Sequence, residues 1–193
     1  KLTSEVRKRT KDWISERLDK SIAEINDIYS NLPKKYPNPL EGFSSIGLDI
    51  KEYFSIVFDK INPKRFLKKD KKLIETLSRI EPKKFVVTIA SKKYSSSLQK
   101  ALGIKKTIVG TYSSEEYYIK DFSKLYIYEV IRKKEKLKRS EVCIVGDNFE
   151  VDILPALKVG YKCILVFNNS NDNGIKSCKS IYEIAKIINE WKN

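Results

Sequence analysis

One stretch in the second half of the chain constrains the fold more than any other. Two short apolar runs, at residues 142–145 and 163–166, are separated by a Gly-Asp turn and by a segment that suits a helix ending at Gly160. Strands joined by a crossover of this length lie parallel, because an antiparallel pair would need only a tight turn. The stretch therefore predicts strand, turn, helix and strand, with Asp147 at the carboxyl end of the first strand, where open α/β sheets bind ligands.

Asp147 and Asp152 are the two aspartates of this stretch. One would lie at the tip of the strand and the other in the first turn of the helix. Such a pair suits Mg²⁺, a hard cation that usually takes one or two protein carboxylates together with substrate phosphate and water. The alternative is that Asp147 caps the helix and that Asp152 favours its N-terminus by charge. The spacing alone does not decide between a metal site and a helix start.

The segments around this stretch alternate in the same way. Apolar, β-branched runs at 85–90 and 107–109 predict strands, and helical patterns cover 93–102 and 123–136. A last helix is expected after Ser180. Helices alternating with strands predict an α/β fold, a Rossmann-like parallel sheet covered on both faces.

Residues 1–80 carry helical patterns only. Ser21 and Glu24 have the spacing of a capping box and predict the start of the second helix. Prolines at 33, 37 and 39 end that helix, and a turn-rich segment follows. We predict two domains, an all-helical cap at residues 1–80 and a Rossmann-like core at residues 81–193.

Charge and hydropathy restrict the partners. The chain has 39 Lys and Arg against 25 Asp and Glu, a net charge of +14, which makes nucleic acid a possible partner. The lysines are spread along the chain and interleaved with acids, so a solvated basic surface that attracts anionic substrates is the favoured interpretation. No apolar run approaches the ~18 residues of a membrane helix, and no targeting pattern opens the chain, so no membrane partner and a cytoplasmic location are expected.

The string from Val145 to Asp152 and on to Gly160 resembles the fourth motif of the haloacid dehalogenase-like hydrolases. The pattern of that motif is an apolar strand, Gly-Asp, four residues and a second Asp. In that family the acidic residues of the motif hold Mg²⁺, directly or through water, beside a phosphorylated substrate. The resemblance implies Mg²⁺ as the cofactor, Asp147 and Asp152 as its ligands, and a small phosphorylated substrate.

Two further motifs extend the resemblance. Phe85-Val-Val-Thr88 is similar to the second motif, whose Thr or Ser hydrogen-bonds the phosphate. Lys120 resembles the lysine of the third motif, which stabilises the charge on nucleophile and phosphoryl group, with Lys124 as the alternative candidate. Asp152 would then support the metal or Lys120. Without the resemblance, Thr88 would be an ordinary strand residue and Lys120 a solvated loop lysine.

The first motif of the family, Asp-x-Asp, does not occur in the 193 residues. Its first Asp is the nucleophile that forms an aspartyl-phosphate. Because the sequence contains no Met, we expect this motif on a strand upstream of Lys1, and a Mg²⁺-dependent phosphatase acting on a small metabolite or nucleotide. The alternatives are a non-catalytic protein of this fold that binds nucleic acid or another polyanion, and a 2-haloacid dehalogenase, which would use the same nucleophile on carbon.

Overall fold

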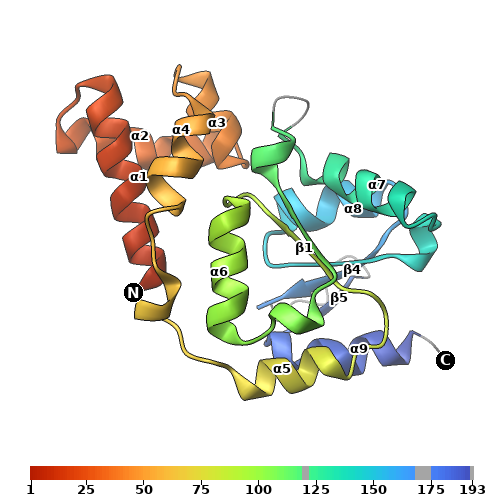
Figure 1. Ribbon diagram of the computed structural model, residues 1–193. Coiled ribbons are helices and arrows are strands. Elements are labelled where there is room, and N and C mark those ends of the chain that lie inside the picture. Colours follow the sequence, from red (N-terminus) through yellow and green to blue (C-terminus); the bar gives the residue numbers. More distant parts are fainter. Residues whose placement is uncertain (119–121, 168–174, 192–193) are drawn as a thin grey trace. The chain divides into compact units, whose positions relative to one another are not determined.

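A computed structural model describes residues 1–118, 122–167 and 175–191 (Figure 1). The chain divides into two compact units, and each is described by itself. The first unit contains Lys1–Lys68, Val86–Leu102 and Thr111–Phe122; the second contains Lys69–Phe85, Gly103–Gly110 and Ser123–Asn193. Among the described residues, no helix has both the length and the apolar character that crossing a membrane requires.

Helices alone make up the first eighty residues, as the sequence predicts. They are α1 (Leu2–Leu18), α2 (Ile22–Lys35), α3 (Pro39–Ser45), α4 (Ile50–Glu52), a π-helical turn (Tyr53–Phe58), a 3₁₀ turn (Pro63–Arg65) and α5 (Lys71–Ser78). The capping box is formed, because Ser21 Oγ accepts from Glu24 N at 3.4 Å and Glu24 Oε2 accepts from Ser21 N at 2.9 Å. The domain boundary at residue 80 stays a prediction.

The core of the first unit is built around an aromatic cluster. Trp13 is 1% exposed, and its ring lies 5.6 Å from that of Phe43 and 5.2 Å from that of Tyr53, measured between centroids. The Trp13–Phe43 pair meets edge to face, a geometry that adds to the gain from burial. The cluster joins α1, α3 and the π-helical turn, so these short helices stabilise one another by packing.

The five strands found in the described residues form two short sheets. One contains β1 (Phe85–Thr88) and β2 (Gly110–Ser113), and the other has the order β3 (Cys143–Gly146), β4 (Lys162–Val166) and β5 (Lys176–Cys178). Both pairings of the second sheet are parallel, with Ile144 opposite Cys163 and Leu165 opposite Ser177. The predicted α/β class is therefore confirmed.

The prediction of a strand at residues 107–109 is wrong. Lys105–Thr107 form a 3₁₀ turn, and β2 begins only at Gly110. Both the backbone N–H and the hydroxyl of Thr107 bond back to the carbonyl of Ile104, at 3.0 and 2.8 Å. These local bonds compete with the hydrogen bonds that would join residue 107 to a neighbouring strand. This is why a β-branched residue at this position lies in a turn.

The second unit covers its parallel sheet with helices. They are α7 (Lys124–Lys134), α8 (Leu154–Lys158) and α9 (Ile184–Glu190), together with α5; α6 (Lys92–Leu102) belongs to the first unit. The β4 residues Cys163 to Val166 are all buried, as expected of a central strand covered on both faces. Helices α5 and α9 lie side by side (Figure 1), and Tyr182 just before α9 donates to Asp70 Oδ2 at 2.7 Å.

Trp13→Ala should lower the free energy of unfolding by roughly 3–5 kcal/mol, the usual loss for a large buried aromatic side chain. The measurement is urea denaturation followed by circular dichroism. Ile22→Ala is the matched control, because Ile22 is 78% exposed and its truncation should change stability little. Equal losses in the two variants would contradict the assignment of Trp13 to the core.

Glu129 on α7 gives the second unit a predictable response to acid. Its carboxylate accepts from Arg132 Nη2 at 2.7 Å, Arg139 Nε at 2.8 Å and Tyr161 Oη at 2.7 Å. Bonding to Arg132 above all, with Arg139 and Tyr161, lowers the pKa of Glu129 from 4.5 to about 2. Because the folded pKa lies below the unfolded one, the stabilisation is complete above the unfolded pKa and is lost as pH falls through about 2.

We therefore expect Glu129→Gln to lose less stability than the wild type as the pH is lowered from 4.5, the unfolded pKa of Glu129, to about 2, its folded pKa. Urea midpoints measured across this pH range test the expectation. Exposed Glu150→Gln serves as the control, since its carboxylate lies outside the Glu129 cluster. Parallel pH profiles for wild type and Glu129→Gln would show that the cluster does not couple protonation to folding.

Candidate active site

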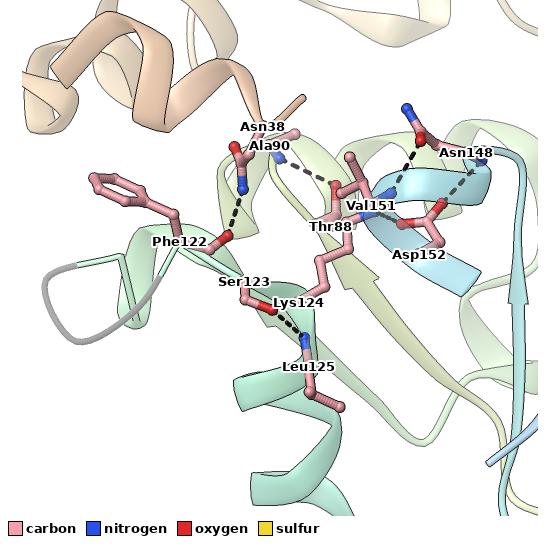
Figure 2. A network of polar contacts seen from close by, with 10 residues as sticks. All are labelled: Asn38, Thr88, Ala90, Phe122, Ser123, Lys124, Leu125, Asn148, Val151 and Asp152. Carbon is pink, nitrogen blue, oxygen red and sulfur yellow. Dashed lines mark hydrogen bonds and ion pairs between the residues drawn. The ribbon is translucent and has the colours of Figure 1, made fainter. Parts of the chain in front are cut away.

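Lys124 and Asp152 form the most buried ion pair of the described residues. Lys124 Nζ lies 2.6 Å from Asp152 Oδ1, and the side chains are only 15% and 4% exposed (Figure 2). Lys124 is the first residue of α7, whose N-cap Ser123 accepts from Leu125 N at 3.1 Å. The helix start thus fixes the backbone from which the lysine reaches the carboxylate.

Asp152 is held by the turn that follows β3. Its Oδ2 accepts from Asn148 N at 3.2 Å, and Asn148 Oδ1 in turn accepts from Val151 N at 3.0 Å (Figure 2). The sequence predicted one continuous helix here, but Phe149–Ile153 form a π-helical turn before α8. Such wider turns occur often at functional sites. Asn148 was missed by the sequence analysis, although an Asn after Gly-Asp favours this kind of local side-chain bonding.

Gly146, the glycine of the Gly-Asp turn, is required by the close approach of Asp152. A Cβ at this position would lie 2.4 Å from Asp152 Cβ and 2.6 Å from Asp152 Oδ2. Any other residue would have to displace the aspartate and its bond to Lys124. The Gly of the motif is thus explained by the close approach of the Asp152 side chain to the backbone of Gly146.

The carboxylate of Asp147 stands in a different environment. Asp147 follows β3 directly and is exposed, and within the described residues its side chain has no hydrogen-bond or ion-pair partner. By contrast, each oxygen of Asp152 already has a protein partner. A cation with oxygen ligands fits Asp147, since Mg²⁺ needs only one or two carboxylates. Asp152 is placed to orient Lys124.

Thr88 and Lys120 complete the predicted set. Thr88 ends β1 in the first unit, where its Oγ1 accepts from Ala90 N at 3.1 Å, so its hydroxyl can still donate. Lys120 lies outside the described residues. The structure therefore brings Lys124 together with Asp152, and places Asp147 on the same turn.

Burial favours the uncharged form of two thiols and one phenol near this turn. It raises the pKa of Cys143 on β3 to about 12 and that of Cys163 on β4 to about 11. Burial and then the charge of Asp152 raise the pKa of Tyr128 on α7. These thiols are protonated at neutral pH and are poor nucleophiles, so the charged groups here are the carboxylates of the turn and the Lys124 ammonium group of α7.

Comparison with known proteins supports the resemblance. Residues 123–184, which contain Lys124, Asp147 and Asp152, match the HAD-hydrolase-like family model. No curated protein matches the sequence.

Solved structures extend the likeness over nearly the whole chain. A HAD phosphatase from Thermococcus onnurineus is 17% identical with a TM-score of 0.60, over 97% of this chain and 89% of that one. A 2-haloacid dehalogenase from Pseudomonas syringae is 15% identical with a TM-score of 0.55, over 96% and 90%. The putative HAD-hydrolase YfnB from Bacillus subtilis, bound to magnesium, is 15% identical with a TM-score of 0.54, over 97% and 92%. The resemblance to the haloacid dehalogenase-like hydrolases is confirmed, in sequence over residues 123–184 and in fold.

Lys124→Met should lower the free energy of unfolding by roughly 3–5 kcal/mol, because it leaves a buried carboxylate without its partner. Adding Asp152→Asn should restore most of this loss by removing the uncompensated charge. Urea denaturation of the two variants measures both effects. In the exposed control Lys8→Met, which breaks the surface pair with Asp12, stability should hardly change. A Lys124→Met variant as stable as the control would mean that the pair is not buried in solution.

Proposed function

We propose that the protein is a Mg²⁺-dependent phosphatase acting on a small phosphorylated metabolite or nucleotide. The observation that carries this proposal is the turn after β3, where the Asp147 carboxylate is free of described protein partners while Asp152 holds Lys124 in a buried ion pair. A metal ligand on this turn and a cation held against it by Asp152 suit a phosphoryl group. The fold shared with a HAD phosphatase and with a magnesium-bound HAD-hydrolase gives further support.

Each predicted residue has a role in this proposal. Asp147 would hold Mg²⁺, which when bound neutralises charge on the phosphate oxygens. Lys124, in place of Lys120, offsets the charge that develops on the phosphoryl group, and Asp152 orients Lys124. Thr88 donates its hydroxyl to a phosphate oxygen. Charge stabilisation and positioning are the main help that a protein gives to phosphoryl transfer.

The proposed reaction also needs a nucleophile. An Asp carboxylate oxygen would bond to phosphorus while the ester oxygen leaves with its electron pair, and water would then hydrolyse the aspartyl-phosphate. The 193 residues contain no Asp-x-Asp. In the described sheet β3 is an edge strand, and such an edge can pair with another strand. We include in the proposal a further strand at this edge that carries the nucleophile next to Asp147.

The dehalogenase alternative shares the fold and the nucleophile. A 2-haloacid dehalogenase is among the structural relatives, so the fold cannot separate the two reactions. The free carboxylate of Asp147 favours a substrate that brings phosphate to a metal. Release of phosphate from an aryl phosphate, against release of chloride from 2-chloropropionate, distinguishes the two.

Asp147→Asn should lower Mg²⁺-dependent hydrolysis of p-nitrophenyl phosphate at least about 100-fold, since oxygen ligands of Mg²⁺ are preferentially carboxylates. It should also weaken Mn²⁺ binding, followed by electron paramagnetic resonance without any turnover. Because the side chain of Asp147 is exposed, the substitution should leave the fold unchanged.

Glu150→Gln is the matched control, because it removes an exposed carboxylate from the same turn. Its activity and Mn²⁺ affinity should stay within about twofold of the wild type, as for a surface substitution outside the site. If Asp147→Asn retained both properties, Asp147 would not be the metal ligand. If the wild type bound Mn²⁺ but hydrolysed no phosphate ester, the phosphatase proposal would fail while the metal site stood.

A further inference from the structure

The segment that follows β1 is held by hydrogen bonds at successive residues, all within the first unit. Thr88 Oγ1 accepts from Ala90 N at 3.1 Å (Figure 2), and the carbonyl of Ala90 accepts from Ser113 Oγ at 2.6 Å. Further along, Lys92 N donates to Glu115 Oε2 at 2.9 Å. The backbone after Thr88, the residue proposed to donate to phosphate, is thus fixed by β2 and by the turn that follows it.

Ser91 lies at the centre of this segment and is completely buried. Its hydroxyl accepts from Tyr94 N at 3.1 Å, as the cap of α6 does, and donates to Asp59 Oδ1 at 2.5 Å. A hydroxyl has a single proton to donate. Because that proton points at Asp59, a lone pair faces Tyr94 N, and the carboxylate determines the orientation of the capping group.

Asp59 is carried by the aromatic core of the first unit. It follows the π-helical turn directly, and its N–H donates to the carbonyl of Phe54 at 3.2 Å. Phe58, its neighbour in the chain, packs on Tyr94 of α6 with 5.2 Å between the ring centroids. Two consecutive residues therefore contact the start of α6, one through an apolar ring and the other through a carboxylate.

Capping of a helix does not account for this aspartate. Asp49 and Asp70 have that role, because each accepts from a backbone N–H of the helix that follows it, at 2.8 Å. Asp59 ends a helical turn instead. Its second oxygen lies 4.0 Å from Nζ of the exposed Lys93, a surface contact that contributes little. Among the described residues, the bond to Ser91 is therefore the strong contact of this carboxylate.

We propose that Asp59 is a positioning residue for Thr88. It holds Ser91, while bonds from β2 and from the turn after it hold the residues on either side. Thr88 is thereby kept where its hydroxyl oxygen accepts from Ala90 N and its proton stays available. A donor fixed in advance loses little entropy when it binds. This inference rests on the proposed function, in which Thr88 donates to a phosphate oxygen.

Two substitutions separate the position of the Asp59 carboxylate from its charge. Asp59→Asn keeps an acceptor in place without the charge, so kcat/KM for p-nitrophenyl phosphate should stay within about twofold of the wild type. Asp59→Glu keeps the charge but displaces the oxygens by one methylene, and it should lower kcat/KM about 10- to 100-fold, as should Asp59→Ala. In a Thr88→Val background none of these changes should have a further effect.

A readout without turnover separates this inference from the proposed function. Hydrogen exchange at the Ala90 amide reports its bond to Thr88 Oγ1, and it should be at least about 10-fold faster in Asp59→Ala than in the wild type. The rate should not change in Asp59→Asn, or in the control Asp49→Ala, which removes a helix cap of the same unit. If the wild type showed no hydrolysis, the proposed function would fail, and this amide would still decide whether Asp59 holds the segment.

Asp59→Glu decides the matter if Asp59→Ala does not fold. An Ala90 amide that exchanges at the wild-type rate in a folded Glu or Ala variant would overturn the proposal. So would a loss of kcat/KM as large in Asp59→Asn as in Asp59→Ala, since that pattern marks an effect of charge. A loss of equal size in the wild-type and Thr88→Val backgrounds would overturn it too, since such an effect does not act through Thr88.

Discussion

The ion pair between Lys124 and Asp152 is the interaction around which the second unit is arranged. Removing two charges from water is costly, and their attraction offsets the cost only where the geometry is good and the other polar atoms are bonded. The turn after β3 meets this condition, since Asn148 N bonds the second oxygen of Asp152 and Gly146 leaves room for the carboxylate. One contact of 2.6 Å therefore links the start of α7 to the turn that follows β3.

Features with a local cause could be predicted from the sequence. The Ser21–Glu24 capping box forms, and the strand, Gly-Asp turn and parallel strand around Asp147 are as expected, because short spacings and side-chain chemistry determine them. The choice between Lys120 and Lys124 has no such local cause. It depends on which lysine reaches Asp152 across a distance of 28 residues in sequence, and periodicity carries no information on side-chain direction.

The strand misplaced at 107–109 shows a second limit. Its composition suited a strand, yet the bonds of Thr107 to Ile104 form a turn, and the ladder starts three residues later. Asn38 shows a third, because its bond to the Phe122 carbonyl joins residues that lie 84 positions apart in the sequence. Local side-chain bonding determines the first outcome, and a contact between distant segments determines the second.

Burial of the three cysteines bears on how the protein withstands oxidation. Cys163 and Cys178 are buried, Cys143 is half-buried, and desolvation raises the pKa of each thiol. Peroxides react with thiolates that solvent can reach; the raised pKa values keep these thiols protonated, and Cys163 and Cys178 are also shielded from solvent. The chemistry proposed for the turn uses carboxylates, a hydroxyl and an ammonium group, none of which changes under oxidising conditions.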